Sequence, residues 1–362
     1  MTTMRFMTSF CGAALLALSC LHAAPAQAQS RIYCGVEVGS KGVKARIFEF
    51  GVKDSESSLR VSFSKDINTT IIASMKDGEL GAAAIAETAD AVAAVIKEMR
   101  GLSEGCKAFA VGSSGVALAK NTASLAEAVA QRIDIGAMDF ITAEQEAEFG
   151  FISSIPKKDW PQAVLVDIGS SNTKIGYRGE GRFRAADLPY GSVSLTKKAA
   201  DGGADFSRAL GSTVDSAVRP ALRDISSRLP GVMNRKKVFW IGGAGWSLAT
   251  FMRPDQGARD FVRLERSDVR RFLGALNDRS WANYRPSAKA SAKARAVFEK
   301  DSARVVEVFS RDNLLAGVSL FDAFLNDRGV DGPIYFVRSG QWIMGYAAAK
   351  FADEIWSEDA LE

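Results

Sequence analysis

A short turn motif occurs twice in this chain, about 130 residues apart, and constrains the fold more than any other feature. Each copy reads acid, branched apolar residue, Gly, Ser, two small or polar residues, branched residue and Lys. The copies run from Glu37 to Lys44 and from Asp167 to Lys174 and align without a gap. Because β-rich apolar segments flank each turn, both copies are predicted to fold as strand, tight turn and strand.

These turns are predicted to bind an anion. Glycine permits close approach of the backbone, so N–H groups and hydroxyls of such a turn can converge on a phosphate. Glu37 ends the first strand and would lie beside that anion, where a metal ion or an attacking water is held. One copy alone is better explained as an ordinary hairpin turn. Two ungapped copies favour a phosphate clamp between two similar domains.

The first 28 residues are predicted to be a secretory signal peptide that is cleaved after Ala28. Arg5 gives a basic start, residues 10–21 form an apolar core too short to span a bilayer, and residues 26–28 have the small-x-small pattern. The alternative is a lipoprotein signal ending at Cys20, which fits poorly because Leu18 lies one position late. With no later membrane-spanning segment, we expect a soluble protein exported to the periplasm.

Length and charge indicate two domains and an anionic ligand. The roughly 330 residues after the signal peptide exceed what one core usually holds. A polar link at residues 156–161 places the domains at 29–158 and 159–362. The net charge is +4 and the positive residues are scattered, which suits a phosphorylated small molecule or a polyanion but not a nucleic acid.

Cysteine and histidine content restricts the chemistry. Cleavage would leave Cys34 and Cys106, each near the start of a predicted strand. In an exported protein this pair could form a disulfide if the strands are parallel neighbours, and two buried thiols are the alternative. The only histidine, His22, lies in the signal peptide, which excludes His-dependent catalysis and His-ligated metal sites. Carboxylate chemistry remains, with a hard metal held by oxygen atoms.

Strands and helices alternate along the rest of the chain, which implies α/β domains. Thr142 and Gln145 are predicted to form a capping box that opens a helix and carries Glu146 in its first turn. Acids at that position are also favoured by the helix dipole, so Glu146 needs further support as a catalytic residue. A late helix is expected at residues 260–277. A duplicated α/β domain with a shared phosphate-binding cleft predicts two actin-like (ribonuclease-H-like) domains.

Several segments match motifs of one family. Residues 37–40 match D-[IL]-G-S-N-S, 111–121 match G-T-[SA]-A-x-R…N, 141–147 match I-S-G-x-E-E-A and 166–174 match V-D-I-G-G-G-S-T-E. Residues 242–245 lie where the superfamily has a G-[GT]-x-G turn. With these motifs the chain resembles the exopolyphosphatase and guanosine-pentaphosphate phosphohydrolase family (Ppx/GppA), within the superfamily of actin, Hsp70 and sugar kinases.

The resemblance implies particular roles. Glu146 would be the base that activates the attacking water, and Asp167 would help to hold that water or Mg²⁺. Asp167 and Glu37 are the expected metal ligands, and homodimers are common in the family. The expected phosphate-contacting residues are Gly39, Ser40, Lys41, Gly42, Lys44, Ser113, Ser114, Gly169, Ser170, Ser171, Asn172, Thr173, Lys174 and Gly243.

Three departures from the family pattern bear on activity. Glu37 replaces an aspartate, and Ala117 stands where the family has an arginine that can bind phosphate through two hydrogen bonds. Lys174 replaces a glutamate, which reverses a charge in the site. A lysine there could bind phosphate and reduce the need for metal, or it could displace the metal and end catalysis.

Three functions follow as hypotheses. The first is a periplasmic exopolyphosphatase that hydrolyses terminal phosphoanhydride bonds with water activated by Glu146. The second is a catalytically degenerate protein that binds polyphosphate, another phosphorylated molecule or a nucleotide. The third is a kinase of the same superfamily, which export disfavours because ATP is scarce outside the cytoplasm.

Overall fold

The computed structural model describes residues 31–53, 56–201, 205–328 and 332–352. The predicted signal peptide and its cleavage site therefore lie outside the described residues. None of the helices in the described ranges is both long and apolar enough to cross a bilayer.

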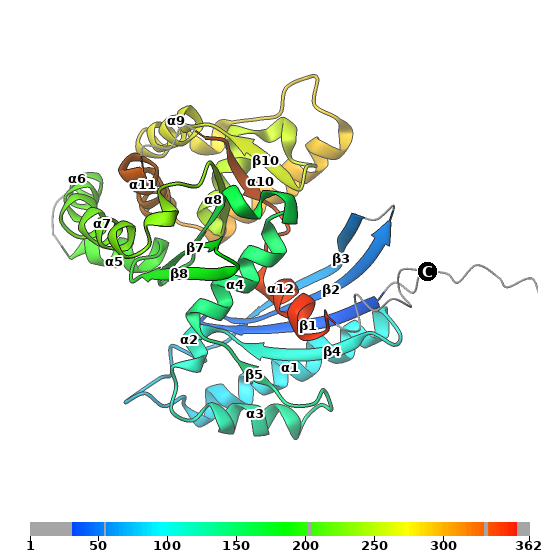
Figure 1. Cartoon of the computed structure of the whole chain (residues 1–362). Coiled ribbons are helices and arrows are strands. Elements are labelled where there is room, and N and C mark those ends of the chain that lie inside the picture. Colours follow the sequence, from blue (N-terminus) through cyan, green and yellow to red (C-terminus); the bar gives the residue numbers. More distant parts are fainter. Residues whose placement is uncertain (1–30, 54–55, 202–204, 329–331, 353–362) are drawn as a thin grey trace, which may run out of the picture.

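The first half of the chain forms a five-stranded sheet with the order β3-β2-β1-β4-β5 (Figure 1). The β1, β2 and β3 strands are antiparallel neighbours, whereas β1, β4 and β5 run parallel. The strands are β1 Arg31–Gly39, β2 Gly42–Lys53, β3 Glu56–Asn68, β4 Lys107–Gly112 and β5 Asp139–Phe140.

The second half repeats this arrangement in a six-stranded sheet with the order β10-β11-β9-β6-β7-β8. Here β6, β7 and β8 are antiparallel neighbours, β6, β9 and β11 run parallel, and β10 adds an antiparallel edge. The strands are β6 Ala163–Ile168, β7 Thr173–Gly179, β8 Arg182–Leu188, β9 Lys237–Ile241, β10 Phe261–Leu264 and β11 Ile334–Val337. The repeated strand order confirms the prediction of two ribonuclease-H-like α/β units.

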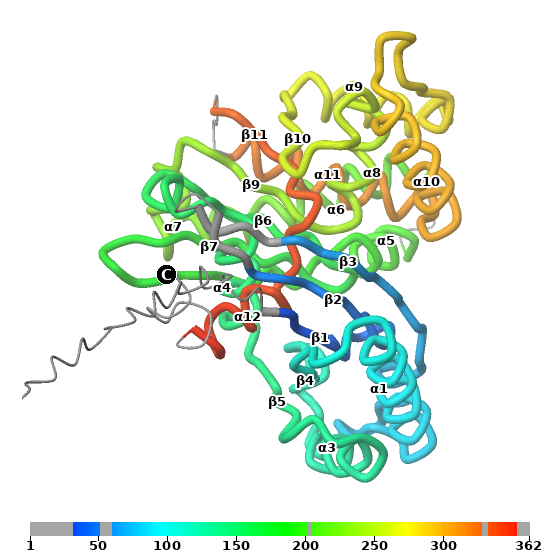
Figure 2. The backbone as a smooth tube through the Cα atoms, turned by 90° about the vertical axis from the view of Figure 1, so that its right-hand side faces the viewer, coloured from blue at the N-terminus to red at the C-terminus, as the bar shows by residue number. Residues whose placement is uncertain are grey.

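Helices cover the faces of both sheets (Figures 1 and 2). The α-helices are α1 Ala82–Leu102, α2 Ser114–Ala117, α3 Thr122–Ala130, α4 Ala143–Ser154, α5 Ser192–Ala200, α6 Phe206–Thr213, α7 Arg219–Arg228, α8 Gly243–Met252, α9 Arg266–Asn277, α10 Ala292–Val308, α11 Arg311–Arg328 and α12 Trp342–Lys350. A π-helical segment, Val214–Val218, joins α6 to α7. Short 3₁₀ helices lie at Lys157–Gln162, Pro230–Val232, Pro254–Gln256 and Trp281–Asn283.

The prediction of one helix over residues 260–277 is wrong at its start. Residues 261–264 form β10, and the helix begins only at Arg266. Alternate residues of β10, Val262 and Leu264, are buried in the core of the second half. So short an alternating run cannot be separated from a following helix by periodicity alone.

Each half sends one helix onto the other sheet. The α4 helix follows β5 of the first sheet, but its Phe151 packs in a cluster with Leu165 and Phe239 of the second. The α12 helix follows β11, but its Ile343 packs with Tyr33 of the first sheet. Both helices lie side by side between the two sheets (Figures 1 and 2). Each of these two helices therefore packs on the sheet of the other half. The predicted domain boundary after residue 158 stays a prediction.

Alternation along the central strands decides which side chains face these exchanged helices. In β1, Val36 lies in the cluster with α1, whereas Tyr33 lies in the cluster with α12. In β6, Leu165 lies in the cluster with α4. Because side chains alternate along a strand, Glu37 and Asp167 are on the faces that α12 and α4 cover. The sheet geometry therefore directs both motif acids into the space between the halves.

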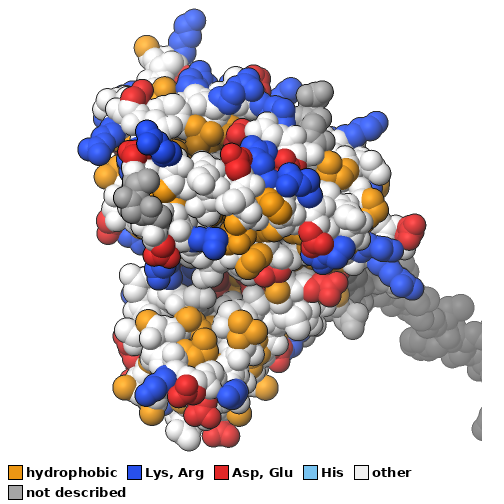
Figure 3. All heavy atoms as spheres, turned by 90° about the vertical axis from the view of Figure 1, so that its left-hand side faces the viewer, with side chains coloured by type: hydrophobic (Ala, Val, Ile, Leu, Met, Phe, Trp, Pro, Cys, Tyr) orange, Lys and Arg blue, Asp and Glu red, His pale blue; other side chains and the backbone are white. Residues whose placement is uncertain are grey.

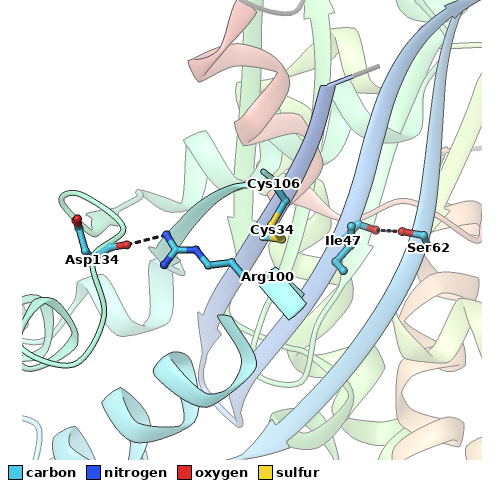
Figure 4. Close-up of a disulfide and its surroundings, with 6 residues drawn as sticks. All are labelled: Cys34, Ile47, Ser62, Arg100, Cys106 and Asp134. Atoms are coloured by element: carbon cyan, nitrogen blue, oxygen red, sulfur yellow. Dashed lines mark hydrogen bonds between the residues drawn. A yellow bond between two sulfur atoms is a disulfide. The ribbon is translucent and has the colours of Figure 1, made fainter. Parts of the chain in front are cut away.

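Cys34 and Cys106 form a disulfide in the structure (Figure 4). Cys34 lies in β1 and Cys106 directly precedes β4, and these strands are parallel neighbours, which was the condition for the disulfide. The Cα atoms are 5.7 Å apart, within the usual range for a disulfide. The bond therefore links two central strands of the first sheet.

Candidate phosphate site between the sheets

The first motif forms a tight hairpin between β1 and β2. Glu37 and Lys44 are directly opposite across the hairpin, and the Lys44 ammonium donates to the Glu37 carboxylate at 3.0 Å. The Lys44 side chain is 48% exposed, so it can also reach a ligand. Gly42 has a φ of +130°, and a Cβ atom there would overlap the backbone of residues 67–69. Glycine is therefore required at this position.

The second motif forms the corresponding hairpin between β6 and β7, with Asp167 directly opposite Lys174. The Gly169 N–H closes the turn on the Asn172 carbonyl at 3.0 Å, and the first residues of α5 donate to the Gly169 and Ser170 carbonyls. Among the described residues, the backbone N–H groups of Ser170 and Ser171 have no protein acceptor. Adjacent free N–H groups in a glycine turn are suited to an anion.

Glu146 connects the two halves of the site. Its helix begins with the predicted capping box, in which the Gln145 N–H donates to the Thr142 hydroxyl and the Thr142 N–H to the Gln145 side chain. One carboxylate oxygen of Glu146 accepts from the backbone N–H of Ser114 at 3.0 Å and from its hydroxyl at 2.6 Å. The other accepts from the Lys174 ammonium at 2.9 Å. Both oxygens of the expected base are thus engaged by protein groups.

Burial and neighbouring charges set the protonation of these carboxyls. Burial by itself raises the pKa of Glu146, but Lys174 and the hydrogen bonds from Ser114 outweigh it, so the pKa is lowered. Burial raises the pKa of Asp167, and Glu146 adds to the increase while Lys174 opposes it. The pKa of Lys174 is raised because Asp167 and Glu146 together outweigh its burial. Glu146 and Lys174 therefore form a charged pair at neutral pH.

The two hairpins face each other. The charges of Lys44 and Glu37 on the first sheet act on the pKa of Asp167 on the second. We refer to Glu37, Lys44, Glu146, Asp167 and Lys174 as the inter-sheet site. The outline of the molecule narrows between its larger and smaller lobes (Figure 3).

Two aspartates beside this site were not anticipated from the sequence. Asp66 on β3 is directly opposite Lys44, and Asp187 on β8 is directly opposite Lys174. Each lysine is thus flanked by two acids on adjacent strands. The strands β7 and β8 are joined by a turn at Glu180-Gly181. Counting residue pairs outward from this turn would have predicted that Asp187 is opposite Lys174.

The other predicted phosphate contacts differ in their surroundings. Lys41 is exposed beside Lys44, and its pKa is lowered by partial burial and by that neighbouring charge. The Thr173 hydroxyl donates to the Tyr190 carbonyl at 2.8 Å, and the Asn172 amide donates to Asp187 at 2.6 Å. These two side chains are therefore already committed to contacts within the protein.

The remaining predicted contacts lie at helix starts near the turns. Ser113 is buried and its N–H donates to the Val38 carbonyl at 2.9 Å, which fixes the start of α2 beside β1. Gly243 opens α8 and packs against the Phe309 ring, where a Cβ atom would overlap. The preceding Gly242 has a φ of +104° and lies against the Ile168 backbone. The N-terminus of α8 is therefore next to the second turn.

The expected metal ligands, Glu37 and Asp167, each have a lysine directly opposite on the adjacent strand. Within the described ranges, no group of three or more His, Cys, Asp or Glu side chains is placed to hold a metal ion. Lys44 occupies the Glu37 carboxylate, and Lys174 is opposite Asp167. The positive charges of both lysines act against a divalent cation at these two carboxylates. Magnesium stays a prediction that a binding measurement must decide.

Comparison with known proteins gives structural similarity only. No protein-family model matches the sequence, and no curated protein matches it. A Ppx/GppA family member from Aquifex aeolicus superposes with a TM-score of 0.64 at 18% identity, over 90% of this chain and 99% of that one. An exopolyphosphatase from Cytophaga hutchinsonii superposes with a TM-score of 0.61 at 13% identity, over 88% and 98%. At such low identity these matches establish the fold: the chain has the two-domain α/β fold of the Ppx/GppA structures, in agreement with the resemblance in its motifs.

Proposed function

We propose that this protein binds the terminal phosphates of polyphosphate, or of a related phosphorylated chain, at the inter-sheet site and hydrolyses the terminal phosphoanhydride bond. One observation carries the proposal. Glu146, an ionised carboxylate, lies between Ser114 of the first half and Lys174 of β7 in the second half. A phosphoryl group held by both turns would therefore lie beside a carboxylate that can accept a proton.

Each part of the site has a chemical role in this proposal. The free N–H groups of Ser170 and Ser171 and the ammonium of Lys44 would bind phosphoryl oxygens. Glu146 would orient the attacking water and accept its proton as the new P–O bond forms and the bond to the leaving phosphate breaks. No step here is assigned to magnesium.

A second candidate function is binding without turnover. Both oxygens of Glu146 accept hydrogen bonds from the protein, and its lowered pKa makes it a weak base. A protein with these features would retain phosphate recognition and lack hydrolysis. Periplasmic location and a homodimer remain part of the proposal, and N-terminal sequencing and sedimentation of the protein from its native host would test them.

The deciding experiment is phosphate release from long-chain polyphosphate by the chain that begins at Gln29. Glu146→Gln keeps the shape of the side chain and removes its charge, so we expect release to fall by about 10²–10⁴-fold. Glu144→Gln is the matched control, because Glu144 lies in the same helical turn and is exposed. Release should stay within about twofold of the unmodified protein in this control.

The outcomes separate the two functions. Release that requires Glu146 supports hydrolysis. Binding of polyphosphate by the folded protein with no release at all supports the binding function. A protein that neither releases phosphate nor binds polyphosphate contradicts both.

A further inference from the structure

We propose that the ammonium group of Lys174 is a built-in cation that takes the place of a divalent metal, so that phosphate binding at the inter-sheet site needs no metal ion. The proposal rests on the phosphate-binding function above and specifies how that function is achieved. It makes Lys174 the residue that determines the metal requirement of the site.

The position of Lys174 is that of a cation among carboxylates. Asp167 and Asp187 are its directly opposite neighbours on the two adjacent strands, and Glu146 accepts its hydrogen bond. Carboxylate oxygens are the ligands that a divalent cation such as magnesium prefers. In this structure the positive charge beside these carboxylates is the ammonium of Lys174, a residue of β7.

Burial fixes this arrangement. The side chains of Lys174 and Glu146 are only 6% and 9% exposed, so the ion pair has little access to competing water. Ser114 occupies the second oxygen of Glu146 with two hydrogen bonds. A divalent cation would have to break these contacts and approach an ammonium of the same sign.

The surrounding groups leave the site able to attract phosphate. Lys44 and Lys41 supply further positive charge from the first hairpin. An ammonium is a compact point charge suited to phosphate, and Lys174 is near the start of β7, which follows the second turn.

The test measures tripolyphosphate binding by isothermal titration calorimetry, once with a chelator and once with magnesium, with the ligand concentration corrected for its magnesium complex. We expect dissociation constants that agree within about threefold in the two conditions. Titration of the protein with Mn²⁺, followed by electron paramagnetic resonance, should show no stoichiometric bound ion. These two measurements use the unmodified protein and do not depend on whether a variant folds.

Variants then assign the effect to Lys174. Lys174→Gln should weaken tripolyphosphate binding at least tenfold in chelator. Lys65→Gln, which removes an exposed lysine of β3 that pairs with Glu98, should change binding less than twofold. Lys174→Arg should retain metal-independent binding because it keeps the charge.

Three results would overturn the inference: binding that appears only with magnesium, Mn²⁺ bound in stoichiometric amount, or unchanged binding by folded Lys174→Gln. Each of these leaves the proposed phosphate function intact. Failure to bind tripolyphosphate or polyphosphate in either condition would instead contradict the proposed function, and the inference with it.

Discussion

Each sheet presents an acid, a lysine and an aspartate at matching positions of three adjacent strands. The first row is Glu37, Lys44 and Asp66, and the second is Asp167, Lys174 and Asp187. In the first row the lysine bonds its strand neighbour and remains half exposed. In the second row the lysine is buried and bonds Glu146, which comes from outside the sheet.

The exchanged helices account for this difference. The α4 helix covers the second sheet and carries Glu146 in its first turn. The α12 helix covers the first sheet, and none of its residues is acidic. Gly345 of α12 lies so close to the Phe149 carbonyl of α4 that a Cβ atom would overlap. Two similar hairpins thus acquire different electrostatics because different helices pack on them.

The largest expected effect comes from removing the buried cation. Lys174→Ala leaves the buried Glu146 without its ion-pair partner, so we expect a loss of about 3–5 kcal/mol in the free energy of unfolding. Urea unfolding monitored by circular dichroism measures this loss. If Lys174→Ala lowered the free energy of unfolding no more than Lys44→Ala does, the two lysines would contribute equally to stability. That result would contradict the difference between the two rows.

The disulfide is a second difference between the two halves. It joins residues of the first half that are 72 positions apart in the sequence. Replacing both Cys34 and Cys106 by Ala should cost about 2–4 kcal/mol of stability. Hydrogen exchange should accelerate in β1 and β4 while β6 and β9 keep their protection. Equal acceleration in both sheets would indicate that the halves unfold as one unit.

Neutralising Asp167 and neutralising Glu37 are expected to change the melting temperature in opposite directions. The pKa of Asp167 is raised above its ordinary value of 3.8, so folding is disfavoured when it is ionised. Asp167→Asn should therefore raise the melting temperature at neutral pH. This gain should disappear as the pH falls through the raised pKa, because the native aspartate then binds a proton.

Glu37→Gln is the matched substitution in the first row. It weakens the hydrogen bond from Lys44, so we expect a small decrease in melting temperature at neutral pH. Scanning calorimetry between acidic and neutral pH compares the two variants. A decrease for Asp167→Asn at neutral pH would mean that the charged aspartate stabilises the fold.

The smallest effect is expected for Lys44→Ala. Its side chain is half exposed and its ion pair with Glu37 is accessible to solvent, so its loss should cost about 1 kcal/mol or less, and less still at high salt. Urea unfolding at two salt concentrations measures this cost. A large cost that does not vary with salt would place Lys44 in an environment as buried as that of Lys174.

Local patterns predicted much of the architecture. The repeated glycine turns, the strands on both sides of them and the capping box at Thr142 are present as expected. These features depend on residues that are close in sequence, such as Gly42, which must adopt a positive φ. The β10 strand was absorbed into a predicted helix, because four alternating residues carry too weak a periodic signal.

The sequence by itself determined the duplicated hairpins, the absence of histidine chemistry after residue 22 and the presence of Glu146 at a helix start. Only the tertiary structure decided what these groups meet. The contacts of Glu146 with Lys174 and Ser114 join residues 28 and 32 positions apart. They form because α4 leaves its own sheet and packs on the other, and no local pattern encodes where a helix docks.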